Sequence, residues 1–132
     1  MEGHNLAQKD LFSASDPYLY ITFGEKVFDE KQHALTDEPN PKFNKQYVFE
    51  AMLPGAPTLR IEVRDDDGLF GYDSIGSTSI DIDDRFFCPQ WKELEHKPIE
   101  QRDLFTPSTG ISQGQISMWL DIERATKEEE KE

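Results

Sequence analysis

The chain has 132 residues, the usual size of a single domain. A single cysteine excludes a disulfide framework and a zinc site built from cysteines. The 14 Lys and Arg residues stand against 27 Asp and Glu, and this net charge of −13 excludes a basic surface for nucleic acid. No apolar run reaches the ~18 residues of a membrane-spanning helix. We therefore expect one folded domain over residues 1–122 and an acidic, flexible tail over 123–132.

The sequence predicts an all-β fold with one helical interruption. Alternating apolar and polar residues rich in β-formers predict strands over residues 18–24, 25–35, 45–51, 58–64, 75–82, 99–105 and 115–122. Apolar residues spaced by 3 to 4 predict a short helix over 83–95, whose regular part is limited by Pro89. The aromatic residues expected in the core of this region are Phe86, Phe87, Trp91 and Trp119. Short strands at this spacing indicate an antiparallel β-sandwich.

Aspartates gather in two loops beside predicted strands. The first loop is flanked by Asp10 and Asp16, and the second contains Asp65, Asp67 and Asp73. Clustered carboxylates repel one another unless a cation lies between them. Ca²⁺ takes six to eight oxygen ligands and tolerates the irregular geometry of loops. A single loop aspartate is more often a turn residue than a ligand, and the chain has no EF-hand loop, so the prediction depends on the whole pattern.

The spacing of these aspartates resembles the signature of calcium-binding C2 domains. Residues 6–18 follow L-x₃-D-x₅-D-P-Y, and residues 63–76 follow V-x-D-x-D-x₅-D-x-I-G. Residues 40–44 (NPKFN) are similar to a turn motif of the same family. The resemblance implies an eight-stranded antiparallel C2-type β-sandwich with a short helix in a late inter-strand insertion. The first strand of this chain is expected to be truncated or missing, because little sequence precedes Gly3.

The same resemblance implies a metal site with two or more Ca²⁺ ions. The carboxylate ligands that it implies are Asp10, Asp16, Asp65, Asp67 and Asp73. The candidates for backbone carbonyl ligands are Leu11, Asp66 and Gly68. Apolar side chains at the loop tips are expected to insert into a membrane, and these are Leu11, Phe12, Leu69, Phe70 and Tyr72.

The second half of the chain resembles an internal C2 domain of ferlins, on the motifs at residues 81–87, 97–104 and 113–122. Ferlins are tandem-C2 proteins with a C-terminal membrane helix, so the resemblance implies a role in membrane trafficking, fusion or repair. The implied partner is an anionic, phosphatidylserine-like membrane at the cytosolic face of the plasma membrane or of vesicles, with other C2 domains or proteins as further partners.

Two other functions are weighed. The chain can instead be a calcium-independent protein–protein interaction domain within a multi-C2 scaffold, which its acidic surface favours. It can also be an enzyme in which Asp10 and Asp65 hold Mg²⁺ for phosphoester cleavage. No Lys or His converges with these aspartates in the sequence pattern, and no Ser or Cys has the neighbouring base of a nucleophilic site. We therefore expect no enzymatic activity.

Overall fold

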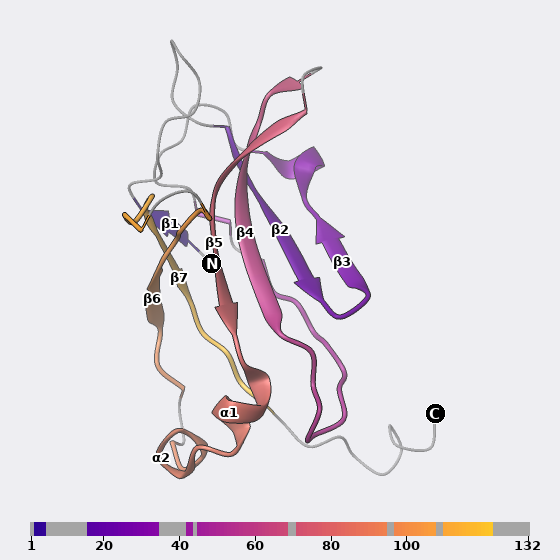
Figure 1. Ribbon diagram of the computed structural model, residues 1–132, viewed down its shortest axis with the longest axis vertical. Helices are drawn as coiled ribbons and strands as arrows, with labels where there is room; N and C mark the ends of the chain where they lie inside the picture. The colour runs from indigo at the N-terminus through magenta and orange to yellow at the C-terminus, as the bar shows by residue number, and fades with distance from the viewer. Residues whose placement is uncertain are drawn as a thin grey trace.

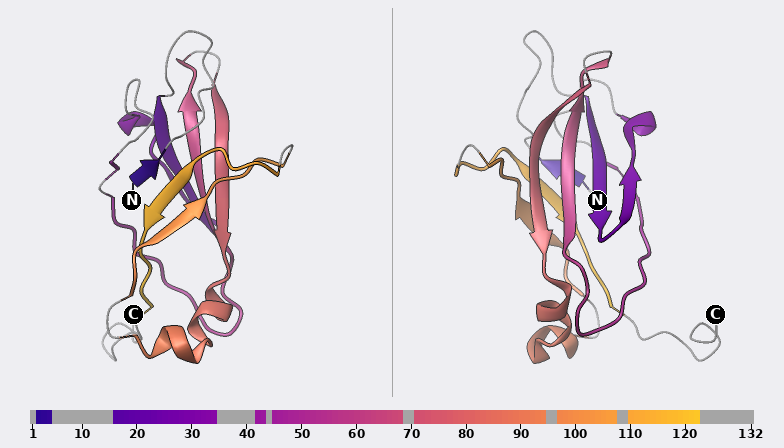
Figure 2. Two further views of the ribbon diagram at one scale, coloured as in Figure 1. Left: turned by 90° about the vertical axis from the view of Figure 1, so that its left-hand side faces the viewer. Right: turned by 45° about the vertical axis from the view of Figure 1, so that its right-hand side comes forward.

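The computed structural model describes residues 2–4, 16–34, 42–43, 45–68, 71–94, 97–107 and 110–122. Within these residues, one antiparallel sheet has the strand order β1-β7-β6 and the other has the order β3-β2-β4-β5 (Figure 1). The strands are β1 (Glu2–His4), β2 (Pro17–Phe23), β3 (Lys26–Asp29), β4 (Leu59–Asp66), β5 (Tyr72–Ile80), β6 (Glu100–Asp103) and β7 (Gln115–Met118). The two sheets face each other, which confirms the predicted all-β sandwich (Figure 2).

The first strand is short. β1 has three residues and pairs with β7, with Glu2 opposite Ser117 and His4 opposite Gln115. A three-residue strand contributes few ladder hydrogen bonds and covers only part of its neighbour's edge. The imperfect first strand expected from the sequence is therefore present as this short element.

The core forms because apolar residues alternate along the strands of both sheets. One face of β2, β4 and β5 supplies most of the buried side chains, and Leu104, Ile116 and Met118 close the core from the other sheet. The residues of the larger sheet in this core cluster are Leu19, Ile21, Phe23, Leu59, Ile61, Val63, Ile75 and Ile80. The opposite face of the larger sheet carries polar and aromatic residues.

The strand predicted over residues 45–51 is wrong. Residues 45–51 form no strand, although partly buried and exposed side chains alternate along residues 46–50. Tyr47 and Phe49 turn inward onto Phe28, with ring centroids 5.1 and 5.5 Å apart, while Val48 is exposed. The alternation in the sequence thus comes from packing on one side of an extended segment. The pattern of apolar and polar side chains alone does not distinguish such a segment from a hydrogen-bonded strand.

The helix predicted over residues 83–95 is divided into α1 (Ile82–Phe86) and α2 (Pro89–Lys92). The side chain of Asp81 caps α1 by accepting a hydrogen bond from the Asp84 amide. Pro89 is the first residue of α2, and Cys88 before it is extended, as the residue before a proline prefers. The proline therefore ends the first helical segment and starts the second. None of the described helices is long and apolar enough to cross a membrane.

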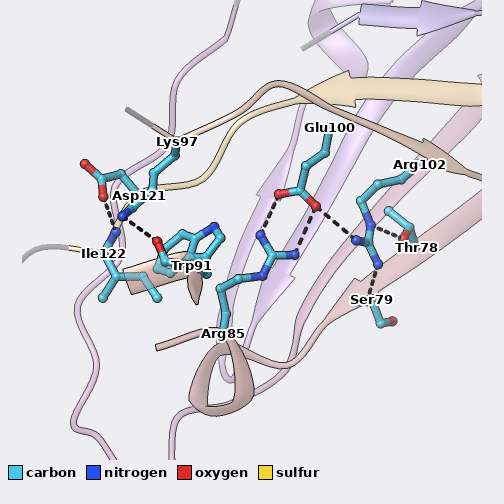
Figure 3. Close-up of polar contacts among 9 residues, drawn as sticks. All are labelled: Thr78, Ser79, Arg85, Trp91, Lys97, Glu100, Arg102, Asp121 and Ile122. Atoms are coloured by element: carbon cyan, nitrogen blue, oxygen red, sulfur yellow. Dashed lines mark hydrogen bonds and ion pairs between the residues drawn. The ribbon is translucent and has the colours of Figure 1, made fainter. Parts of the chain in front are cut away.

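An ion pair attaches the helical insertion to β6, and hydrogen bonds from β6 continue to β5 (Figure 3). The Arg85 guanidinium of α1 makes two hydrogen bonds to Glu100 of β6. Glu100 also accepts from Arg102, whose Nε and Nη2 donate to Thr78 Oγ1 and the Ser79 carbonyl of β5 at 2.8 and 3.1 Å. Burial would raise the pKa of Glu100, but the hydrogen bonds and charges of the two arginines hold it below its ordinary value.

The aromatic residues expected in the core divide into two groups. Phe87 and Trp119 are 54% and 60% exposed, so their assignment to the core is wrong. Phe86 and Trp91 are half-buried, and the Lys97 ammonium lies 4.4 Å from the Trp91 ring centroid.

A backbone bridge joins the two sheets beside Gly76. The amide and carbonyl of Ser77 exchange hydrogen bonds of 3.0 and 3.1 Å with those of Phe105, which joins β5 to the segment after β6. A Cβ atom on Gly76 would lie 2.9 Å from Leu104 Cβ and 3.0 Å from the backbone of Leu104 and Phe105. Only glycine leaves room for this contact.

We predict that Gly76→Ala lowers the free energy of unfolding by about 1–3 kcal/mol, because backbone atoms must move to admit the methyl group. Urea denaturation measures this change. Gly110→Ala is the matched control, since a Cβ there meets no atom within 4 Å. Equal stability of the two variants would contradict a close backbone approach at Gly76.

Candidate metal centre

The strand register brings three of the predicted aspartate ligands to one end of the larger sheet. Pro17 of β2 lies opposite Asp65 of β4, and Asp65 lies opposite Asp73 of β5. Asp16 immediately precedes Pro17 and therefore lies at the same end. This end is the top of the molecule in Figure 1, opposite the two helices.

Asp65 connects the two aspartate loops. Its side chain is fully buried, and its Oδ1 accepts a hydrogen bond of 2.8 Å from the Asp16 amide. The Asp66 amide in turn donates to the Asp16 carbonyl at 3.0 Å. A buried carboxylate is stable only when hydrogen bonds or cations compensate its charge. The contact therefore fixes the position of Asp16 relative to the end of β4.

Asp66 points its carboxylate away from Asp65, because successive residues of a strand face opposite sides of the sheet. Its Oδ1 accepts a hydrogen bond of 2.9 Å from the Gly68 amide and lies 3.8 Å from the Lys31 ammonium. The side chain of Asp66 is thus engaged in the turn that follows β4, which leaves its backbone carbonyl as the candidate metal ligand.

The second loop is closed at its base. The Asp67 amide donates to the Gly71 carbonyl at 2.9 Å, and the Gly71 amide approaches the Gly68 carbonyl at 3.3 Å. Both glycines have positive φ, 60° at Gly68 and 92° at Gly71, which residues with a side chain rarely adopt. These contacts hold Asp67 and Asp73 on either side of one tight turn.

Several predicted site residues lie outside the described residues. These are Asp10, Leu11 and Phe12 of the first loop and Leu69 and Phe70 of the second. Among the residues that are described, no three acidic, His or Cys side chains lie close enough together to hold a metal ion. The carboxylates that are described match Ca²⁺ in their chemistry and in their location at one end of the sheet.

The sequence analysis did not predict the cluster of side chains around Arg64 on the outer face of the larger sheet. The Arg64 guanidinium lies between the rings of Tyr20 and Tyr72, 3.5 and 3.7 Å from their centroids. Its Nε is 2.6 Å from Oε1 of Glu62, whose Oε2 accepts from Ser74 at 2.8 Å. The sequence signal is the alternation of charge at residues 60, 62 and 64, which places these side chains on one face of β4.

Glu62 is buried at the centre of this cluster. Burial would raise the pKa of Glu62, but hydrogen bonds from Arg64, Ser74 and Arg60 outweigh it and hold the pKa below its ordinary value of 4.5. A carboxyl with a lowered folded-state pKa stabilises the protein above its unfolded-state pKa. This contribution is lost as the pH falls through the folded-state value.

Glu62→Gln should therefore destabilise the protein at pH 7 by about 1–3 kcal/mol, since charged hydrogen bonds to buried partners are lost. The difference from the parent should shrink as the pH falls below 4.5, where the parent loses the same charge. Urea denaturation between pH 3 and pH 7 measures both effects. The same substitution at exposed Glu50 is the control and should change the stability little. A difference that is independent of pH would contradict this account of Glu62.

Comparison with known proteins gives one family and a set of similar relatives. A family model described as "C2 domain" matches residues 1–101. Myoferlin of Xenopus tropicalis is 35% identical over 86 residues, which are 65% of this chain and 4% of that protein. Ferlin 2 of Toxoplasma gondii is 28% identical over 114 residues, 81% of this chain and 8% of that protein. The chain thus spans only a small part of these relatives, and their names confirm the resemblance to ferlins.

Solved structures share the fold. The first of the C2 domains of plant Extended Synaptotagmin 1 has a TM-score of 0.65 at 18% identity, covering 88% of this chain and 83% of that one. A structure of Extended-Synaptotagmin 2 that holds its SMP domain and two C2 domains has a TM-score of 0.59 at 25% identity, covering 89% of this chain and 24% of that one.

Proposed function

Since the chain belongs to the C2 domain family, we propose that it is a calcium-dependent module that binds anionic phospholipid membranes. The observation that carries the proposal is the register of β2, β4 and β5, which gathers Asp16, Asp65 and Asp73 at one end of a sheet. Asp67 follows β4 at the same end, and Asp10 completes the set in the sequence. The carbonyls of Leu11, Asp66 and Gly68 are the proposed backbone ligands.

The proposed mechanism of membrane binding depends on charge. A domain with a net charge of −13 is repelled by an anionic membrane. Five carboxylates carry about −5 at the site, and two Ca²⁺ ions would add +4. Ions at the rim of such a site keep coordination positions for phosphate or carboxylate oxygens of lipid head groups. Calcium would therefore cancel most of the negative charge at the site, which weakens the repulsion, and would also bridge to the membrane.

Apolar loop tips would add binding that salt does not screen. Leu11, Phe12, Leu69 and Phe70 are the proposed inserting residues, and each large apolar side chain that is buried contributes about 1.5–3 kcal/mol. Tyr72 differs, because its ring is stacked on Arg64 and is 45% exposed. Its insertion would cost the stacking contact.

The proposed setting is the cytosolic face of the plasma membrane or of vesicles, within a larger membrane-anchored protein that acts in trafficking, fusion or repair. The similarity to myoferlin and to other ferlins supports this setting. We assign the domain a binding role and no catalysis.

A second candidate function is calcium-independent protein binding. Ile99 and Trp119 are 72% and 60% exposed, and they flank the paired residues Glu100 and Met118 of β6 and β7. Exposed apolar residues that adjoin one another are common at protein interfaces. This function predicts binding that is independent of calcium.

We expect the domain to bind Ca²⁺ with a measurable heat and to melt at a higher temperature in its presence, because the ions bind only the folded state. At 100 times the Kd, the gain is about 2.7 kcal/mol. Calorimetry measures calcium binding, and co-sedimentation with phosphatidylserine-containing vesicles in Ca²⁺ or EGTA measures membrane binding. Phosphatidylcholine vesicles and Mg²⁺ are the controls. An unchanged melting temperature and no heat at millimolar Ca²⁺ would overturn the metal site, and the absence of calcium-dependent sedimentation would favour the second function.

Asp67→Asn should weaken calcium binding about tenfold or more, since it removes a proposed charged ligand. Asp66→Asn is the matched control, because it removes the same charge one residue away and can still accept the Gly68 hydrogen bond. Calcium titrations of both variants measure the difference. Equal losses would show that the register of the second loop is assigned wrongly.

A further inference from the structure

We infer that Arg64 is a positioning residue for the second aspartate loop, and that it acts through Tyr72. The inference rests on the calcium-binding function proposed above. Arg64 offers no oxygen atom to a cation, so its effect on calcium binding must come from the shape of the loop or from its charge. These two effects have opposite signs.

The Arg64 guanidinium is held on three sides. The Tyr20 and Tyr72 rings lie on it at 3.5 and 3.7 Å, and Glu62 accepts a hydrogen bond of 2.6 Å from its Nε. The Arg64 side chain is only 13% exposed. A cation stacked on aromatic rings and shielded from water interacts more strongly than an exposed one. These contacts therefore fix the position of the Arg64 side chain on the sheet.

Tyr72 links the Arg64 side chain to the second aspartate loop. It is the first residue of β5, pairs with Asp66 across the ladder, and lies between Gly71 and the proposed ligand Asp73. The Gly71 carbonyl accepts the Asp67 amide, so a displacement of Tyr72 moves both sides of the turn. An ion pair at this loop, between Lys31 and Asp66 at 3.8 Å, joins partly exposed groups and contributes less.

The charge of Arg64 acts in the other direction. A cation near a calcium site repels Ca²⁺, so removal of its charge alone would strengthen calcium binding. Positioning predicts weaker binding after the same change. Arg60 provides the comparison, because it carries the same charge and pairs with the same Glu62 at 3.3 Å, without a stacking contact to Tyr72.

Calcium titrations of four single variants test the inference. Arg64→Gln and Tyr72→Leu should weaken calcium binding by about 2- to 30-fold, the range that corresponds to the loss of a cation–π contact. Arg60→Gln and Tyr72→Phe should bind calcium as the parent does or more tightly. The double variant Arg64→Gln/Tyr72→Leu should lose no more than the larger single loss, because either change alone already removes the contact between Arg64 and Tyr72 on which the positioning depends. Parental or tighter binding by Arg64→Gln, or additive losses, would overturn the inference.

Amide hydrogen exchange in EGTA separates this inference from the proposed function. The Asp67 and Gly71 amides should exchange faster in Arg64→Gln and Tyr72→Leu than in Arg60→Gln and Tyr72→Phe, whether or not the parent binds calcium. A parent without calcium binding but with this exchange pattern would overturn the function and keep the positioning role. Equal exchange in all four variants would overturn the positioning role. If Arg64→Gln does not fold, Tyr72→Leu still decides, since it removes a half-exposed ring without changing charge.

Discussion

The hydrogen bond from the Asp16 amide to the buried Asp65 carboxylate is the contact on which the acidic end of the domain depends. It joins two loops that are 49 residues apart in the chain and places a negative charge where water does not reach it. Such a charge is tolerated only with compensation, and further carboxylates at the same end add to the repulsion. The fold thus keeps an arrangement that a bound cation would relieve.

The two ends of the sandwich differ in the arrangement of their described charged residues. At the helical end, Arg85 and Arg102 pair with Glu100, so the charge of this partly buried carboxylate is compensated by the protein. At the opposite end, the described cations Lys31 and Arg64 lie on the outer face of the sheet, whereas Asp65 faces the interior. The carboxylate of Glu100 is thus paired with arginines, whereas the proposed calcium ligands lie at the opposite end of the sandwich.

The sequence predicted most of the fold because side-chain alternation and β-formers determine β2, β4, β5 and β7. It placed the ends of these strands within a few residues, and so located the aspartate loops. It failed at residues 45–51, where inward packing without ladder hydrogen bonds gives the same alternation as a strand. It also missed the stacking of Arg64, because a contact between Tyr20, Arg64 and Tyr72 depends on the register of three strands.

The placement of the Ser77–Phe105 backbone pair has a mechanical consequence. The second aspartate loop joins β4 and β5 of the larger sheet, whereas β7 belongs to the smaller sheet and runs toward the helical end (Figures 1 and 2). A pulling force between the aspartate loops and Ile122 must therefore pass from one sheet to the other. The Ser77–Phe105 pair and the interlocked core side chains would carry this force in shear, in which many contacts share the load and fail together. We expect these contacts to make the two sheets respond to tension together.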